Sequence, residues 1–117
     1  MTMTFCLPAP PSANSLFRNV PGVGRVRTAR YKTWAQAAGW ALKLDGNKSR
    51  TWETINGPVA LTIICGARGD LDNKIKALSD LLVSSAVIKD DDQVVDIRIT
   101  RGGSAKEAIV TVKELGA

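Results

Sequence analysis

The chain has 117 residues, 44% of them hydrophobic and 23% charged, which predicts one globular domain over residues 1–117. It has no histidine and only two cysteines, which excludes a Ser-His-Asp triad, a His-ligated zinc site and a four-cysteine cluster. Any enzymatic chemistry must therefore use carboxylates, amines, hydroxyls and a hard metal ion. No apolar run approaches the ~20 residues of a membrane span. The N-terminus lacks the pattern of a secretory signal, so we expect a cytoplasmic protein.

The charge of the chain is unevenly distributed. Residues 1–50 carry eight basic residues and one acidic residue, a net charge of +7. Residues 51–117 carry eight basic and ten acidic residues, a net charge of −2. A basic half beside an acidic half is typical of a protein that binds a polyanion and acts on it. The alternative is a basic surface that serves solubility alone.

The first predicted element is a short strand over Thr2–Leu7. Residues 8–27 are rich in Pro, Gly, Asn and Arg, which predicts a basic loop, and a loop this long is usually functional. Thr28 then predicts the N-cap of a first helix that ends at about Leu44. Its apolar stripe is Tyr31, Trp34, Ala38 and Ala41.

The second half of the chain predicts three strands of a sheet and one more helix. The run VALTIICG after Pro58 is apolar on both faces, which indicates a strand inside a sheet. A helix over Asp72–Ser84 follows, with an apolar stripe of Leu71, Ile75, Leu78 and Leu82 that Leu81 widens. Then come a half-buried strand at 95–100 and a last strand over Ala108–Lys113 as its hairpin partner. The order β-α-β-α-β-β predicts an α/β (α+β) class fold, a two-layer domain with a mixed four-stranded sheet and two helices. Cys6 and Cys65 both lie in apolar runs and are expected to be buried.

Two acidic clusters are the candidate site. Asp70 and Asp72 lie in GDLDN before the second helix, and Asp90, Asp91 and Asp92 lie before the third strand. If these two strands are sheet neighbours, we expect both clusters near one end of the sheet. Crowded carboxylates repel one another unless a cation bridges them, and Mg²⁺ or Mn²⁺ suits oxygen ligands.

A lysine accompanies the first cluster. Lys76 follows Asp72 by one helical turn, where it would reach a bound phosphate oxygen or the attacking water. The alternative interpretation makes Asp72 a simple helix cap and the DDD run a solvated turn.

Three segments carry a resemblance to a known family: LPAPPSANSLFRN at 7–19, DLDNKIKALSDLL at 70–82 and IKDDDQVVD at 88–96. With them the chain resembles the RusA-type crossover junction endodeoxyribonucleases, small Holliday junction resolvases of bacteria and prophages. The resemblance implies that Asp70, Asp72 and Asp91 bind the metal, that Lys76 is the catalytic lysine and that Asp90 is a close neighbour. It also implies a homodimer that cuts opposed strands of a four-way junction with Mg²⁺ or Mn²⁺, leaving 5′-phosphate and 3′-hydroxyl ends, in recombination and repair.

The predicted DNA contacts are mostly basic side chains. The arginine run that we expect before DLDN is here GARG, and a lysine four residues after Asp70 would partly compensate. The residues predicted to contact DNA are Asn14, Arg18, Arg25, Arg27, Arg30, Lys32, Arg68 and Lys74. We expect the dimer surface in the N-terminal segment and at apolar residues such as Val87 and Ile88.

Two other functions fit the residues less fully. One is a non-enzymatic DNA-binding module in which the acidic clusters are structural. The other is a Mn²⁺-dependent enzyme that uses its D-x-D on a nucleotide sugar, or an aspartyl-phosphate phosphatase, for which the basic loop has no evident role.

Overall fold

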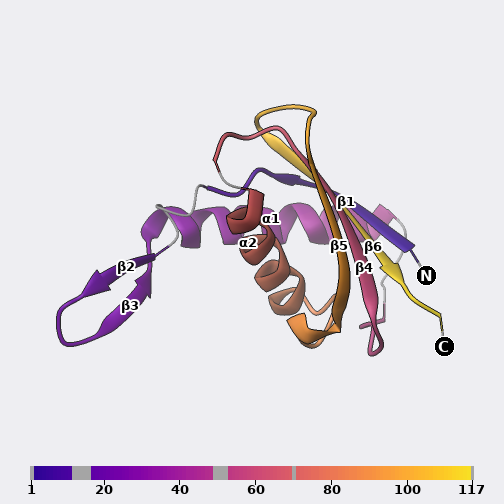
Figure 1. The fold of residues 1–117 in the computed structure, drawn as a ribbon, viewed down its shortest axis with the longest axis horizontal. Coiled ribbons are helices and arrows are strands. Elements are labelled where there is room, and N and C mark those ends of the chain that lie inside the picture. The colour runs from indigo at the N-terminus through magenta and orange to yellow at the C-terminus, as the bar shows by residue number, and fades with distance from the viewer. Residues whose placement is uncertain (1, 12–16, 49–52, 70, 117) are drawn as a thin grey trace.

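A mixed four-stranded sheet forms one layer of the structure, and two helices on one of its faces form the other (Figure 1). The computed structural model describes residues 2–11, 17–48, 53–69 and 71–116. The strands of the sheet, in spatial order, are β1 (Thr2–Pro8), β6 (Glu107–Glu114), β4 (Val59–Cys65) and β5 (Val94–Arg101). The helices are α1 (Ala29–Lys48) and α2 (Leu71–Ser84). The predicted fold class is therefore confirmed.

The core lies between this sheet and the helices. Alternate residues of β4 are fully buried, as a pleated strand covered on one face requires. They pack with the predicted stripes of both helices in one cluster, which includes Leu61, Ile63, Val110, Trp34, Leu78 and Leu82. The other face of the sheet carries no helix among the described residues, and Cys6 is exposed there, contrary to the prediction, whereas Cys65 is buried. The Cys65 thiol is free.

Helix α1 begins where the sequence predicts. The backbone N–H of Tyr31 donates to Thr28 Oγ1 at 3.1 Å, so Thr28 caps the first turn. The indole N–H of Trp34 donates to the carbonyl of Pro8 at 2.8 Å, which ties the helix to the end of β1. No helix within the described ranges is long and apolar enough to cross a membrane.

The predicted loop at residues 8–27 contains a hairpin, so that prediction is wrong for its second half. Strands β2 (Phe17–Val20) and β3 (Gly24–Arg27) pair antiparallel, and the hairpin projects from the body beside the start of α1 (Figure 1). Gly22 and Gly24 have positive φ values of 77° and 100°, a conformation that favours glycine. The strands have four residues each, too few to give an alternating apolar pattern.

The last strand does not pair with the third one, and the predicted hairpin is wrong. Strand β6 lies between β1 and β4, antiparallel to both, and leaves β5 at the edge of the sheet. The connection crosses the end of β4 at Gly66, where a Cβ would meet the carbonyl oxygens of Gly103 and Ser104 at 2.6 Å. Glycine is therefore required at this crossing. As an edge strand, β5 is mostly exposed rather than half-buried.

Two residues that we expected at a dimer surface belong to the core instead. Val87 and Ile88 are both buried. The backbone of Val87 accepts a hydrogen bond from the N–H of Ile55 at 3.0 Å, and Ile88 forms a parallel β-bridge with Ile55. The segment after α2 is thus tied to the chain that leads into β4.

Candidate functional site

The described aspartates of the two predicted acidic clusters lie at opposite ends of a strand pair. Strands β4 and β5 run parallel, with Val59 beside Val94 and Cys65 beside Arg101. Asp72 follows the carboxyl end of β4, whereas Asp91 precedes the amino end of β5. The expectation that both clusters meet at one end of the sheet is therefore wrong, because the end of one parallel strand and the start of the next lie at opposite ends of the sheet. Helix α2 spans the distance between them.

The second cluster is a short 3₁₀ helix, η2 (Asp91–Gln93), with a well-defined cap. The Asp90 side chain accepts from the backbone N–H of Asp92 at 2.9 Å. In return, Gln93 Oε1 accepts from the backbone N–H groups of Asp90 and Lys89 at 3.0 and 2.7 Å. This reciprocal capping box fixes the backbone of the turn that carries Asp91.

Gln93 also attaches the turn to the rest of the protein. Its amide nitrogen donates to the carbonyls of Ile55 and Gly57, each at 2.8 Å. Gln93 is not among the residues predicted from the sequence. A glutamine three residues after a capping aspartate is the signal that would have found it.

The three aspartates of the turn are close together and exposed. Asp90, Asp91 and Asp92 each offer a carboxylate oxygen within 4.8 Å of the others. A hydrogen bond shared with Asp90 raises the pKa of Asp91, and the charges of Asp90, Asp92 and Asp80 raise it further. The pKa of Asp90 is lowered, first by the backbone N–H of Asp92 and then by that shared hydrogen bond. Such a crowded set of hard oxygen donors fits Mg²⁺ or Mn²⁺.

Helix α2 carries charged residues between the two clusters on one face. Asp72, Lys76 and Asp80 are spaced four residues apart, so Asp72 and Asp80 are about 12 Å apart along the helix axis. Lys76 Nζ lies 3.6 Å from Asp80 Oδ2. Lys76 therefore pairs with Asp80, a residue that our sequence analysis did not select. Asp72 is exposed in the first turn and is not within the group of described carboxylates around Asp91.

Asp80 also holds a tyrosine of the first helix. The hydroxyl of Tyr31 donates to Asp80 Oδ2 at 3.2 Å. Burial raises the pKa of Tyr31, and the negative charge of Asp80 adds to the rise, whereas Arg27 opposes it. The contact joins residues 49 positions apart, so no local pattern could have predicted it.

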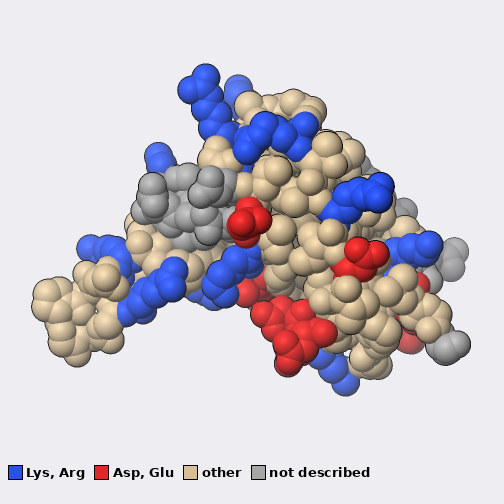
Figure 2. Space-filling view, in the orientation of Figure 1, with Lys and Arg blue, Asp and Glu red and all other residues tan. Residues whose placement is uncertain are grey.

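One pocket is lined by residues of both the hairpin and the acidic turn. Arg27 at the end of β3 lines it together with Asp80, Lys89, Asp90 and Asp91. The Arg27 guanidinium lies 5.0 Å from the centre of the Tyr31 ring, and that of Arg25 lies 4.2 Å from the centre of the Phe17 ring. These cation–π contacts orient the two arginines. Figure 2 shows basic side chains on the hairpin side and a dense acidic patch on the adjoining body.

The other predicted DNA contacts differ in placement. Arg18, Arg30, Lys32 and Arg68 are exposed, as are Arg25 and Arg27. Lys74 is fully buried, and its Nζ donates to the carbonyl of Pro10 at 3.4 Å. The prediction that Lys74 contacts DNA is therefore wrong, because its ammonium group lies inside the protein. Asn14 and Asp70 lie outside the described residues.

Comparison with known proteins identifies the family. The model of the family described as Endodeoxyribonuclease RusA matches residues 8–113. The chain is 35% identical over 101 residues to the crossover junction endodeoxyribonuclease rusA of Enterobacteria phage HK97, which covers 84% of this chain and 81% of that protein. The family and the nuclease class predicted from the sequence are confirmed.

Proposed function

Because the chain belongs to the RusA family of endodeoxyribonucleases, we propose that it resolves four-way DNA junctions by metal-dependent, paired nicks in recombination and repair. The observation that supports this most directly is the pocket shared by Arg27 and Asp91. It puts a phosphate-binding cation beside carboxylates that suit a divalent metal. The phage relative agrees with a bacterial or prophage origin.

The basic side chains of the hairpin and α1 would bind the sugar–phosphate backbone. Arg18, Arg25, Arg27, Arg30 and Lys32 are all exposed. Contacts to phosphates give affinity and orientation but little sequence information. This fits an enzyme that selects its substrate by shape. A basic projection beside an acidic pocket would hold one DNA strand across the carboxylates.

Asp91, with Asp90 or Asp92 beside it, would hold the divalent cation, Mg²⁺ or in its place Mn²⁺. When bound, such an ion lowers the pKa of water and stabilises charge on a phosphoryl group. Asp90 and Gln93 fix the backbone of this turn, so the Asp91 carboxylate is positioned before the cation binds. We propose Asp72, at the opposite end of α2, and Asp70 as further carboxylates of the reaction.

Lys76 is the proposed cationic residue of the chemical step. Its ammonium group is half exposed and pairs with Asp80, on the α2 face that runs from Asp72 toward the acidic turn. From there it would stabilise the negative charge that develops on the phosphate. Cleavage at the phosphorus–oxygen bond to the 3′ oxygen would leave 5′-phosphate and 3′-hydroxyl ends.

Paired nicks require two active sites, so we propose a two-fold homodimer as the acting unit. The competing proposal, a DNA-binding module whose acidic residues are structural, predicts junction binding without cleavage. Membership of an endodeoxyribonuclease family favours the enzyme.

The test uses a labelled synthetic four-way junction beside plain duplex and single-stranded DNA of the same sequence. With Mg²⁺ present, we expect two symmetric nicks in the junction and no cutting of the other two substrates, and chelator should abolish the cleavage. The nicked strands should be rejoined by DNA ligase, which requires 5′-phosphate and 3′-hydroxyl ends. Junction binding without nicks in Mg²⁺ or Mn²⁺ would support the binding module instead.

A further inference from the structure

The loop between β4 and α2 leads directly to Asp72, a proposed carboxylate of the reaction. Residues 66–69 of this loop read Gly-Ala-Arg-Gly, so it has few side chains that could pack. Ala67 is partly buried against the core, whereas Arg68 and Gly69 are exposed. Because two of the four residues are glycines, holding the loop in one conformation costs more conformational entropy than usual. The loop therefore depends on contacts from elsewhere in the chain.

Arg101, the last residue of β5, supplies two of these contacts. Its Nη1 donates to the carbonyl of Ala67 and its Nη2 donates to the carbonyl of Gly69, each at 2.7 Å. The two nitrogens belong to one planar guanidinium group, so the two carbonyls are held in a fixed relative orientation. Hydrogen bonds from a charged donor are also stronger than those from a neutral one. The loop is thus bound to β5 on both sides of Arg68.

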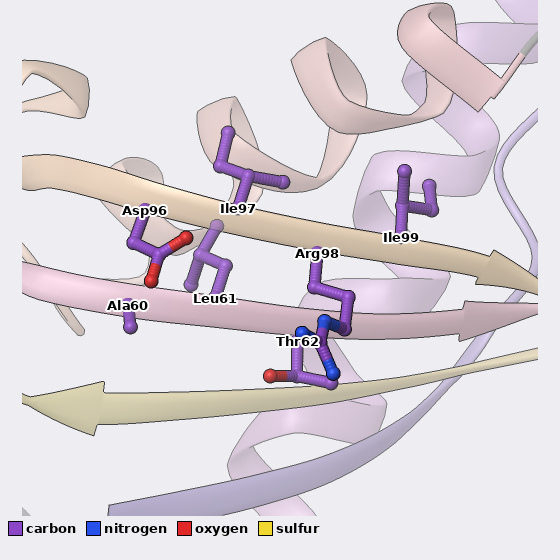
Figure 3. Close-up of a pocket in the computed structure, with 7 residues that line it drawn as sticks. All are labelled: Ala60, Leu61, Thr62, Asp96, Ile97, Arg98 and Ile99. Carbon is purple, nitrogen blue, oxygen red and sulfur yellow. The ribbon is translucent and has the colours of Figure 1, made fainter.

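The pleat of β5 explains why an arginine at this position reaches the loop. Ile97 and Ile99 lie on one side of the strand, and Arg98 lies on the other (Figure 3). Arg101 continues the alternation on the isoleucine side, and it is in register with the buried residue Cys65. It therefore lies on the face that the helices cover, at the end where the chain leaves β4 toward α2.

The bond to Gly69 bears most directly on the proposed site. The Gly69 carbonyl belongs to the peptide group that continues to residue 70, so its orientation sets the direction in which the chain enters α2. Gly69 has a φ of 107°, which is one of many conformations open to glycine, and the bond from Arg101 favours this one. The N–H groups of the first helical turn have no intrahelical partners, so the order of this turn depends on the segment before it.

We propose that Arg101 is a positioning residue of the cleavage reaction, because it fixes the loop from which the first turn of α2 presents the Asp72 carboxylate. The proposal rests on the proposed role of Asp72 in cleavage. Groups that act on a reacting phosphate must be held within about 0.5 Å of their productive positions. A loop released from Arg101 would therefore slow the chemical step without removing any contact to DNA.

The test combines cleavage of a labelled four-way junction with the mobility of the loop in the DNA-free protein. Arg101→Lys keeps the charge but replaces the two-nitrogen fork with one ammonium group, and Arg101→Gln removes the charge as well. We expect both to lower kcat by about tenfold or more, with KM and junction affinity within about twofold of the wild type. The NMR order parameters of the Arg68 and Gly69 amides should fall from about 0.85 to below about 0.6.

Arg98→Lys is the matched control, because Arg98 lies on the same strand but on its other side. It should change neither kcat nor the order parameters. The urea midpoint of both Arg101 variants should equal that of the wild type, since the two hydrogen bonds are exposed to water. A lowered midpoint with unchanged order parameters would make Arg101 a residue of general stability and would overturn the proposal.

Two further results would contradict the positioning role. They are a wild-type kcat in Arg101→Lys despite a mobile loop, and order parameters that stay at the wild-type value in both variants. A loss confined to KM and junction affinity would make Arg101 a DNA contact instead. If the wild type cut no junction, the proposed function would fail, whereas the order parameters would still decide whether Arg101 fixes the loop.

Discussion

The hydroxyl of Tyr31 on α1 donates a 3.2 Å hydrogen bond to Asp80 on α2, and the same carboxylate oxygen pairs with Lys76. This contact connects the helix that carries the basic side chains to the helix that carries the proposed catalytic lysine. It also links the hairpin to the acidic turn, because Arg27 and Asp91 line the pocket in which Asp80 lies.

Tyr31 should ionise only above the pH of an ordinary tyrosine. Its pKa is raised from 10.0, mainly by burial and then by Asp80. The chain has a single tyrosine, so tyrosinate absorbance reports this residue alone. In Asp80→Asn the midpoint should fall toward 10.0, the ordinary value, but stay above it, because burial remains. An unchanged midpoint would mean that the Asp80 charge does not act on Tyr31.

The same shift predicts how stability depends on pH. The pKa of Tyr31 is higher in the folded state than in the unfolded chain, so its protonated hydroxyl contributes a constant amount to stability at pH values below 10.0. This contribution is lost as the pH rises through the folded-state pKa. The free energy of unfolding should therefore decline in alkaline solution. Tyr31→Phe should remove this part of the decline, as measured by urea unfolding at several pH values. A decline of equal size in Tyr31→Phe would assign it to other groups.

Asp80→Asn should lower junction cleavage by about tenfold while leaving junction binding unchanged, because Lys76 loses the carboxylate that holds its ammonium group. The Lys76 side chain is 56% exposed and that of Asp80 is 27% exposed, so water partly screens the pair and its loss should change stability by less than about 1 kcal/mol. Tyr31→Phe is the control, since it removes the hydrogen bond and leaves the ion pair intact. Equal losses of cleavage in both variants would point to helix packing rather than to Lys76.

The sequence predicted those features that depend on local pattern. The cap at Thr28 and the apolar stripe of α2 follow from residues a few positions apart, and both are confirmed. The family was evident from three short motifs. The acidic cluster at Asp90–Asp92 is also present as a set of neighbouring carboxylates.

What the sequence did not predict depends on long-range arrangement. Strand β6 pairs with β1 and β4 rather than with β5, and its connection passes close to Gly66, a contact between residues far apart in the sequence. Whether Lys74 is buried depends on how the N-terminal segment folds over α2, because the Lys74 ammonium group donates to the carbonyl of Pro10. The hairpin strands are short and bear exposed arginines, so they lack the apolar alternation from which strands are predicted.

The carboxylates at the two ends of α2 should differ in their effect on cation binding. Asp72→Asn and Asp91→Asn should each abolish cleavage and spare junction binding, as should Asp70→Asn. Of Asp72→Asn and Asp91→Asn, only Asp91→Asn should weaken Mn²⁺ binding to the DNA-free protein, because its carboxylate lies in the crowded turn and that of Asp72 does not. Paramagnetic broadening of the NMR signals of nearby amides by Mn²⁺ measures this.

Glu107→Gln, an exposed carboxyl exchange on β6, is the control for these three variants. It should retain both cleavage and Mn²⁺ binding. If Asp72→Asn lost Mn²⁺ binding as fully as Asp91→Asn, the cation site would not be confined to the acidic turn. Full cleavage by Asp91→Asn would remove the turn from the active site.

Removal of charge from the hairpin should weaken junction binding in a salt-dependent way. If Arg25 and Arg27 each contact a phosphate, then Arg25→Gln and Arg27→Gln should each lower the slope of log affinity against log salt by about 1. Binding isotherms at several salt concentrations measure the slope. Lys106→Gln, in the exposed turn before β6, should leave it unchanged. A slope that does not change in either arginine variant would exclude the hairpin from the DNA contact.

Gln93→Ala should destabilise the protein and impair cation binding together. The side chain satisfies four backbone groups, two as acceptor and two as donor, so its loss leaves the carbonyls of Ile55 and Gly57 without this partner. We expect a loss of about 1–3 kcal/mol in the free energy of unfolding. Gln93→Glu keeps both acceptor contacts and loses both donors, so it should destabilise as well while preserving the cap.

Comparison of these two variants separates the two tasks of Gln93. Urea unfolding measures stability, and Mn²⁺ titration measures the geometry of the turn. Lys89→Ala changes a side chain of the turn but keeps the backbone N–H that donates to Gln93 Oε1. Its free energy of unfolding should therefore stay within about 0.5 kcal/mol of that of the wild type. If Gln93→Ala were as stable as Lys89→Ala, the contacts to Ile55 and Gly57 would not hold the turn. The position of Asp91 would then have to depend on its bound cation instead.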